Sequence, residues 1–286
     1  MSTMLSDSFL KRLDALALRM RHPAAGGSGG LRRSRALGSS VEFSDFREYA
    51  AGDDIRRVDW NAYARFDKLF LKLFMEEQEQ RVHLIVDASA SMDFGKWEPA
   101  CQLAQTLGYL CLCGGDSVTV YTLGGGGERH TRPLRGRHCY PELSAFLESV
   151  QPQGRAMIET AVPALRLAGG RGASVLIGDL LDGWEKAVLS LLYRKQETSV
   201  LQVWSPAEWD PQLEDTAELV DSETGERFLT SGGYEALRRY RETARAYVEE
   251  ISDFCRTRGV SHGLIVPEES FEDQLIRALS AAGLIA

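Results

Sequence analysis

Residues 82–87 read VHLIVD, and the chain continues through residue 91 as ASAS. A short apolar run of this kind is typical of a strand that is buried on both faces of a parallel sheet. ASVLIGD (173–179) and TSVLQVW (198–204) have the same character. The three runs predict central strands of one sheet.

The segments between these runs alternate between helical and strand patterns. Further strands are expected in DSVTVYTL (116–123) and VSHGLIV (260–266), and the glycines at 124–127 predict a turn into an antiparallel edge strand. Residues 217–229 predict a small hairpin. Apolar spacing predicts helices at 97–113, 140–149, 157–168, 184–194, 233–257 and 270–282. This alternation predicts an α/β fold, a doubly wound, mostly parallel sheet with helices on both faces.

The N-terminal part of the chain has a different pattern. Apolar residues at mostly helical spacing predict an amphipathic helix over 5–20, and AAGGSGG (24–30) predicts a break after it. Residues 31–81 show no clean period and are expected to wrap on the neighbouring domain as an extended segment. We therefore expect two parts, an N-terminal helix with a wrapping segment (1–81) and an α/β domain (82–286).

Composition limits the functional classes. No apolar run of about 18 residues is present, so a membrane span is not expected. The five cysteines include no C-x-x-C pair, which favours reduced thiols and a cytoplasmic protein. Residues 1–74 hold 13 Lys and Arg against 9 Asp and Glu, and residues 75–286 hold 20 against 32. The basic segment either covers the acidic domain or docks an acidic partner, and no aromatic platform indicates nucleic-acid binding.

Two carboxylates follow predicted strands, Asp87 and Asp179. In open α/β sheets, ligands bind beyond the carboxyl ends of the strands, where the strand order reverses. Ser89 and Ser91 follow Asp87 at alternate positions, and such an oxygen-rich loop suits Mg²⁺. The alternative is that the serines cap the next helix while Asp87 bonds to backbone amides.

The D-x-S-x-S spacing resembles the metal-ion-dependent adhesion site of von Willebrand factor A domains. The resemblance implies a divalent cation held by Asp87, Ser89, Ser91 and Asp179, with a coordination position open to an acidic side chain of a partner. It also implies a Thr ligand before the next helix, where this chain has Ala156. Thr160 lies about one helical turn further on and is not expected to replace it.

The segment before the first central strand resembles the signature of the domain-of-unknown-function 58 family. The matching residues are Glu42, Phe43, Arg47, Tyr49, Gly52, Asp53, Asp54, Arg56, Asp59, Trp60, Ala64 and Arg65. Proteins of this family are often paired with MoxR-type AAA+ ATPases, so the resemblance implies a non-enzymatic adaptor between such an ATPase and a protein client. It covers about residues 30–266.

The residues of this signature also have a direct physical interpretation. Gly52-Asp53-Asp54 predicts a turn whose carboxylates hold arginines or backbone amides, and the aromatic residues that follow offer area for packing. A buried clasp is the first interpretation; a surface that faces a partner and a second metal site are the others. For the whole protein, the alternatives to an adaptor are a metal-dependent hydrolase that uses the strand-end site and a metal-free scaffold. The hydrolase lacks a general base in the sequence pattern.

Overall fold

The structure is a computed structural model. It describes residues 5–15, 42–50, 53, 55, 58–66, 68–75, 80–124, 127–167, 172–212, 217–221, 225–230, 233–267, 271–282 and 284. The chain forms two compact units, a larger one of Met1–Met20 with Gln80–Ala286 and a smaller one of Arg21–Glu79.

Elements are labelled here in chain order. They are α1 (Asp7–Leu13), β1 (Glu42–Glu48), α2 (Trp60–Phe66), β2 (Phe70–Met75), β3 (Arg81–Asp87), the 3-10 helix η2 (Ala90–Asp93), α3 (Trp97–Cys113), β4 (Ser117–Gly124), β5 (Gly127–His130), β6 (Leu134–Arg135), the 3-10 helix η3 (Arg137–Cys139), α4 (Tyr140–Glu148), α5 (Ile158–Ala164), β7 (Gly172–Gly178), α6 (Trp184–Tyr193), β8 (Gln196–Val203), α7 (Pro206–Trp209), β9 (Ala217–Val220), β10 (Arg227–Thr230), α8 (Tyr234–Thr257), β11 (Ser261–Ile265) and α9 (Phe271–Ala281).

The larger unit is built on one sheet with the order β11-β8-β7-β3-β4-β5, and β6 also pairs with β4. The strands β11, β8, β7, β3 and β4 are parallel to their neighbours, whereas β5 and β6 run antiparallel to β4. This topology confirms the predicted mostly parallel sheet with an antiparallel edge. The strands and helices expected after residue 82 are present, with shifts of a few residues at their ends.

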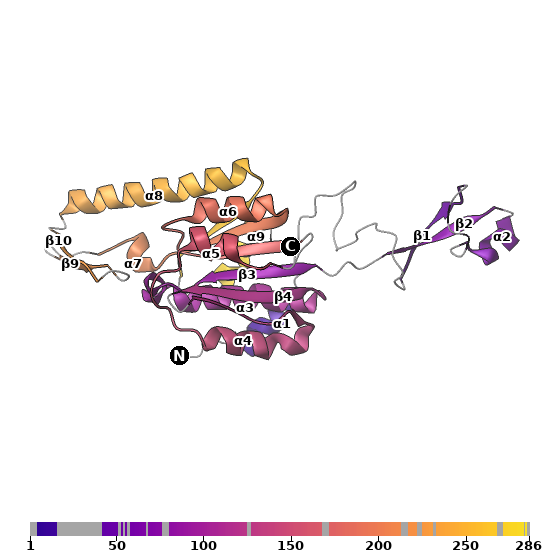
Figure 1. The fold of residues 1–286 in the computed structure, drawn as a ribbon, viewed down its shortest axis with the longest axis horizontal. Helices are drawn as coiled ribbons and strands as arrows, with labels where there is room; N and C mark the ends of the chain where they lie inside the picture. The colour runs from indigo at the N-terminus through magenta and orange to yellow at the C-terminus, as the bar shows by residue number, and fades with distance from the viewer. Residues whose placement is uncertain are drawn as a thin grey trace. The chain divides into compact units, whose positions relative to one another are not determined.

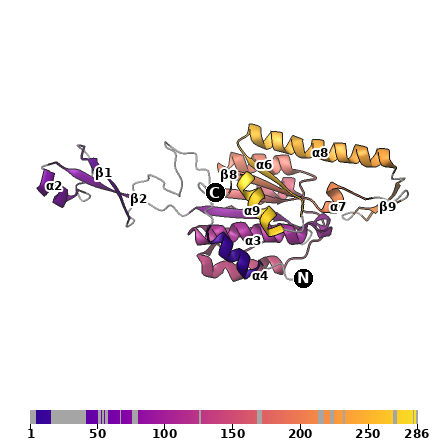
Figure 2. The same cartoon turned by 180° about the vertical axis from the view of Figure 1, so that it is seen from behind.

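Helices cover both faces of this sheet (Figures 1 and 2). On one face, the buried side chains of α1, α3, α4 and α9 form a core with the strands. On the other face, α5, α6 and α8 form a second core. In β3 every residue after Arg81 is buried, which explains why its sequence is a continuous apolar run rather than an alternating one.

The strand order reverses beside β3. The chain moves from β3 to β4 in one direction, whereas β7, on the other side of β3, leads to β8 in the opposite direction. The connections that leave β3 and β7 therefore separate to opposite faces. This is the position at which doubly wound sheets leave a crevice for ligands.

Helix α1 belongs to the larger unit, which differs from the expected grouping of residues 1–81. Leu5, Phe9 and Leu13 are buried in the core that includes α3 and α4. The hydroxyl of Tyr109 in α3 also donates a hydrogen bond to Asp14 at 2.8 Å. The apolar face of the helix packs in this core. The helix therefore belongs to the larger unit and not to the unit of the segment that follows it.

The smaller unit contains regular structure where an extended wrap was expected. Its strands β1 and β2 pair antiparallel, and α2 lies between them in the chain. The register shifts between Phe43 and Asp45, so β1 contains a bulge or irregularity that breaks the two-residue alternation. A break of this kind disturbs the strand period in the sequence.

Candidate functional site

The first part of the site is the pair of carboxylates at the ends of β3 and β7. Asp87 is the last residue of β3, and Asp179 directly follows β7. Both are buried. Gly178 allows the two strand ends to pack closely, because a Cβ at this position would lie only 2.7 Å from the Cβ of Asp87.

The loop after β3 connects the two carboxylates through its serines. The amide of Ser89 donates to Asp87 Oδ1 at 2.8 Å, and the hydroxyls of Ser89 and Ser91 lie 3.0 Å apart. Ser91 Oγ donates to Asp179 Oδ2 at 2.7 Å. The structure therefore brings together all four residues predicted from the D-x-S-x-S pattern. Ser89 precedes η2 but makes no side-chain capping bond there, so capping does not account for its hydroxyl.

Two further charged residues of the site were not predicted from the sequence. Lys96 has no exposed surface, and its Nζ lies 2.8 Å from Asp179 Oδ2 and 2.6 Å from Glu208 Oε1. Glu208 belongs to α7, where it forms a capping box with Ser205. The S-x-x-E pattern directly after β8 was the available signal for Glu208, because it marks a helix that begins at the same edge of the sheet.

The carbonyl oxygen of Asp179 is fixed from the neighbouring strand. Trp204 Nε1 donates to it at 3.0 Å and Gln202 Nε2 at 3.2 Å. The next residue, Leu180, is buried and has a φ of 56°, a left-handed conformation that is uncommon for leucine. Backbone strain of this kind persists only where the surroundings hold it, so the loop after β7 is a fixed part of the site.

Burial controls the charges at the site. It raises the pKa of Asp87 to about 7, and the negative charge of Asp179 acts in the same direction, against the hydrogen bonds from Ser89. Burial acts to lower the pKa of Lys96, but the carboxylates of Asp179 and Glu208 outweigh it and raise that pKa above its usual value. At neutral pH Lys96 is therefore a buried cation, and Asp87 takes up a proton more readily than an ordinary carboxylate.

Ala156 lies where the resemblance to adhesion sites implies a threonine ligand. Its loop adjoins the D-x-S-x-S loop, because Gln153 N donates to the Ala88 carbonyl at 2.9 Å and Ala90 N donates to the Gly154 carbonyl at 2.8 Å. Ala156 packs in an apolar core and offers no hydroxyl. The hydroxyl of Thr160 donates to the backbone carbonyl of Met157 at 3.1 Å, so it is used within its own helix.

These residues do not fit a resident Mg²⁺ as they are arranged. Mg²⁺ binds oxygen at about 2.1 Å. An ion on Asp179 Oδ2 would lie within about 5 Å of the Lys96 ammonium, which is itself 2.8 Å from that oxygen. At an effective dielectric constant of about 20, the two cations would repel by roughly 7 kcal/mol. Mg²⁺ on this oxygen therefore requires the ammonium to leave it.

Exposed apolar side chains occur on the loops that carry and adjoin this polar centre. Phe94 follows η2 and is 57% exposed, Met157 precedes α5 and is 61% exposed, and Leu181 follows β7 and is 53% exposed. Met157 also has a left-handed backbone, with a φ of 43°. We call these three residues the apolar rim. They lie on the loop after β3, the loop before α5 and the loop after β7. Backbone hydrogen bonds join the first loop to the second, and Ser91 joins the first to Asp179 on the third.

The signature residues in the smaller unit have mainly local roles in the part that the structure describes. Asp53 accepts a hydrogen bond from the Ala50 amide at 2.8 Å, and buried Asp59 accepts from the amides of Asn61 and Ala62 at the start of α2. Trp60 is 59% exposed within this arrangement.

The remaining signature residues are placed as follows. Tyr49 donates its amide to the Leu69 carbonyl at 2.9 Å, and Arg65 is exposed in α2. Glu42 and Arg47 lie in β1, but their side chains are outside the described part. Gly52, Asp54 and Arg56 lie outside the described residues altogether, and with them the predicted turn and second metal site.

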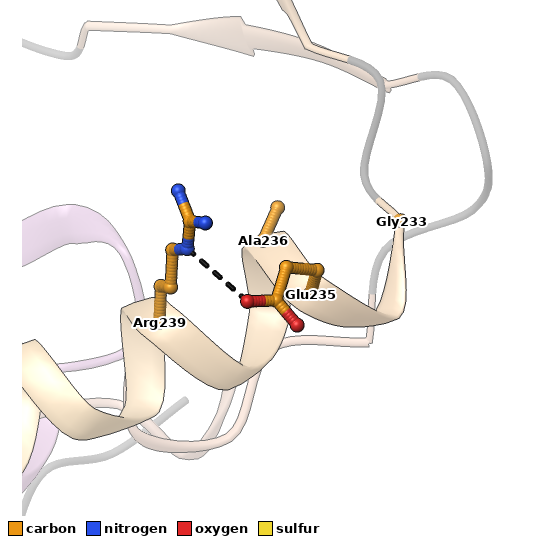
Figure 3. A pocket seen from close by; sticks show the side chains of 4 residues that line it. All are labelled: Gly233, Glu235, Ala236 and Arg239. Atoms are coloured by element: carbon orange, nitrogen blue, oxygen red, sulfur yellow. Dashed lines mark hydrogen bonds and ion pairs between the residues drawn. The ribbon is translucent and has the colours of Figure 1, made fainter.

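A shallow hollow also occurs at the start of α8. It is lined by Gly233, Glu235, Ala236 and Arg239, and Arg239 Nε lies 3.3 Å from Glu235 Oε1 (Figure 3). Both charged side chains are more than half exposed. An exposed ion pair of this kind contributes little energy, so we assign no binding function to the hollow.

The strand order and the polar centre at its reversal define a doubly wound α/β domain with a switch-point site. The chain belongs to the family described as protein of unknown function DUF58, which matches residues 45–250. This match confirms the family resemblance seen in the sequence. The chain is 30% identical over 201 residues to the uncharacterized protein Mb1516 of Mycobacterium bovis. The aligned part is 66% of this chain and 62% of that protein, less than two thirds of the relative's length.

Solved structures with some similarity include the conserved hypothetical protein BatB from Bacteroides thetaiotaomicron and the VWA domain of SpRpn10. The first is 17% identical with a TM-score of 0.38, over 71% of this chain and 98% of that one. The second is 8% identical with a TM-score of 0.38, over 69% and 94%. At these scores the similarities add nothing to the fold, which follows from the strand order. No helix among the described residues is long and apolar enough to cross a membrane.

Proposed function

We propose that this protein is a cytoplasmic, non-enzymatic interaction module, an adaptor that couples a MoxR-type AAA+ ATPase to a protein client. The observation that carries the proposal is the apolar rim around the strand-end site. Phe94, Met157 and Leu181 are each more than half exposed, although they are large apolar residues. Exposed apolar side chains grouped around a polar centre are typical of a protein-binding surface.

The charges at the site support binding rather than catalysis. A carboxylate with a pKa near 7, such as Asp87, suits a general base, and this observation favours the hydrolase alternative. However, Asp87 is only 3% exposed and Ser89 only 2%. A substrate cannot reach this buried pair without a rearrangement of the loop. Ser91 and Glu208 are partly exposed, but the most exposed side chains of the site are those of the apolar rim, which offer contact area and no acid–base chemistry.

The adaptor role is supported by the family signature and by the sequence. The chain lacks the G-x-x-x-x-G-K-[ST] phosphate loop, so its own sequence offers no such site for ATP. A partner ATPase would supply the energy, and this chain would supply recognition. The Mg²⁺ implied by the resemblance stays a prediction, and the proposed adaptor does not depend on it.

The test is binding to a purified MoxR-type ATPase from the same source organism, measured by calorimetry with ATP analogue, with ADP and without nucleotide. We expect Phe94→Ser and Leu181→Ser to weaken binding at least fivefold, the effect of losing one buried interface side chain. Leu189→Ser is the matched control, because Leu189 is 47% exposed on α6, away from the three loops of the rim.

Two results would contradict the proposal. Absence of binding in every nucleotide state would remove the adaptor role. Equal affinities for the wild type, Leu181→Ser and Leu189→Ser would leave the adaptor role in place but move the binding surface away from the carboxyl edge of the sheet.

A further inference from the structure

We propose that Lys96 is the built-in cation of the strand-end site, where its ammonium provides the positive charge that a divalent metal provides in adhesion sites of the resembling type. The site is then complete without metal. The inference rests on the proposed function only for the identity of the partner, because the charge arrangement can be tested on this chain alone.

Asp179 already has two hydrogen-bond donors on one carboxylate oxygen. Its Oδ2 accepts from Lys96 Nζ at 2.8 Å and from Ser91 Oγ at 2.7 Å. A carboxylate oxygen has two lone pairs in its plane, so both are already used. A metal at this oxygen must displace one of these donors, and the ammonium is the one that it would repel.

The backbone around Lys96 fixes the position of this residue. Its amide donates to the Met92 carbonyl at 3.1 Å, and its carbonyl accepts from Ala100 at 3.0 Å at the start of α3. The preceding Gly95 has a φ of 72°, a left-handed conformation that glycine adopts freely. The backbone is thus fixed on both sides, and the side chain has no exposed surface.

Glu208 fixes the second side of the ammonium. Its Oε1 accepts from Lys96, while its Oε2 accepts from the amide and the hydroxyl of Ser205 at 2.9 Å and 3.2 Å. The carboxylate is therefore oriented by its own helix cap. Lys96 is held between two carboxylates. In a metal site, several carboxylates surround one cation. Here the Lys96 ammonium takes the place of that cation.

The consequence concerns what a partner can offer. The ammonium is buried and already bonded to two carboxylates, so it has no open coordination position for an acidic side chain. The most exposed side chains left for the partner are those of the apolar rim. We therefore expect a partner segment that binds through apolar side chains and keeps its affinity when EDTA removes divalent cations.

The experiment titrates metal alone into the purified full chain, with calorimetry for Mg²⁺ and electron paramagnetic resonance for Mn²⁺. The wild type and Lys96→Arg should show no binding at the site. Lys96→Met leaves Asp179 and Glu208 without their cation and should bind Mg²⁺ with an affinity at least about a hundredfold above the detection limit that bounds the wild type, because the repelling charge is gone. Lys96→Met combined with Asp179→Asn should lose this gain.

Each outcome decides the proposal. Wild-type metal binding that Asp179→Asn abolishes would overturn it, and this measurement holds even if Lys96→Met does not fold. A folded Lys96→Met that gains no metal affinity would overturn it as well. These results are independent of the partner: failure of the ATPase to bind would remove the adaptor role and leave the metal result unchanged, whereas metal binding by the wild type would leave the adaptor role in place.

Discussion

Replacement of Lys96 by methionine should destabilise the larger unit strongly, even without metal. The side chain of Lys96 is completely buried, and its two partners, Asp179 and Glu208, have 5% and 22% of their side chains exposed. Breaking a buried ion pair from one side costs about 3–5 kcal/mol, because an unpaired charge is left behind. Glu208 can turn partly to water and Asp179 keeps its bond from Ser91, so we expect about 3 kcal/mol.

The assay is urea unfolding followed by tryptophan fluorescence and circular dichroism. At an m-value of roughly 2–3 kcal/mol/M, the expected loss lowers the midpoint by about 1–1.5 M urea. Lys186→Met is the matched control, because Lys186 makes an equally short ion pair, 2.6 Å to Glu159, with 73% of its side chain exposed. That variant should leave the midpoint unchanged.

Equal midpoints for Lys96→Met and Lys186→Met would refute the reasoning, since the buried pair would then be worth no more than the exposed one. A further check is the addition of Asp179→Asn to Lys96→Met. This change removes the more deeply buried of the two uncompensated charges and should recover part of the lost stability.

Three further predictions concern buried residues of the larger unit. Burial lowers the pKa of His83 to about 4. Since the unfolded chain takes up the proton near pH 6.5, the contribution of His83 to stability should fall by up to about 3 kcal/mol as the pH drops from 6.5 to 4, while Asp87, with its pKa raised to about 7, contributes in the opposite direction. The difference in unfolding free energy between the wild type and His83→Leu should therefore change by this amount over the same range, and a constant difference would contradict a neutral buried histidine. Gly178→Ala should cost about 1–3 kcal/mol, because its Cβ would lie 2.7 Å from that of Asp87, whereas Gly233→Ala, with open space around it, should be neutral in the same urea assay. Phe9→Ala should cost about 3 kcal/mol by thermal or urea unfolding, since Phe9 is fully buried, and a neutral result would show that α1 is not part of the core.

The sheet of the larger unit could be predicted because its strands are buried on both faces. Such strands read as continuous apolar runs, and the residues that follow them mark the carboxyl edge. Asp87 and Asp179 were recognisable for this reason. The serines were recognisable because they follow Asp87 at fixed spacing on the same loop.

Lys96 and Glu208 were not recognisable in the same way. Their sequence separation is 112 residues, and they meet only because β8 returns the chain to the same edge of the sheet. A lysine before a helix is an ordinary surface feature, and nothing in its neighbours indicates burial. The place of α1 was missed for a related reason, since an amphipathic helix does not specify which core receives its apolar face. The strand β1 was hidden by its broken register.

The capping box of α7 connects the buried charges of the site to the helices around it. Glu208 joins Lys96 to the cap of α7, and the backbone carbonyl of Glu208 accepts a hydrogen bond at 2.7 Å from the hydroxyl of Tyr240 in α8. Arg241 of α8 pairs with Asp210 at 2.6 Å. One continuous line of contacts thus runs from the floor of the site to the long helix. A change at Lys96 therefore acts on the same residue that caps α7 and accepts from α8.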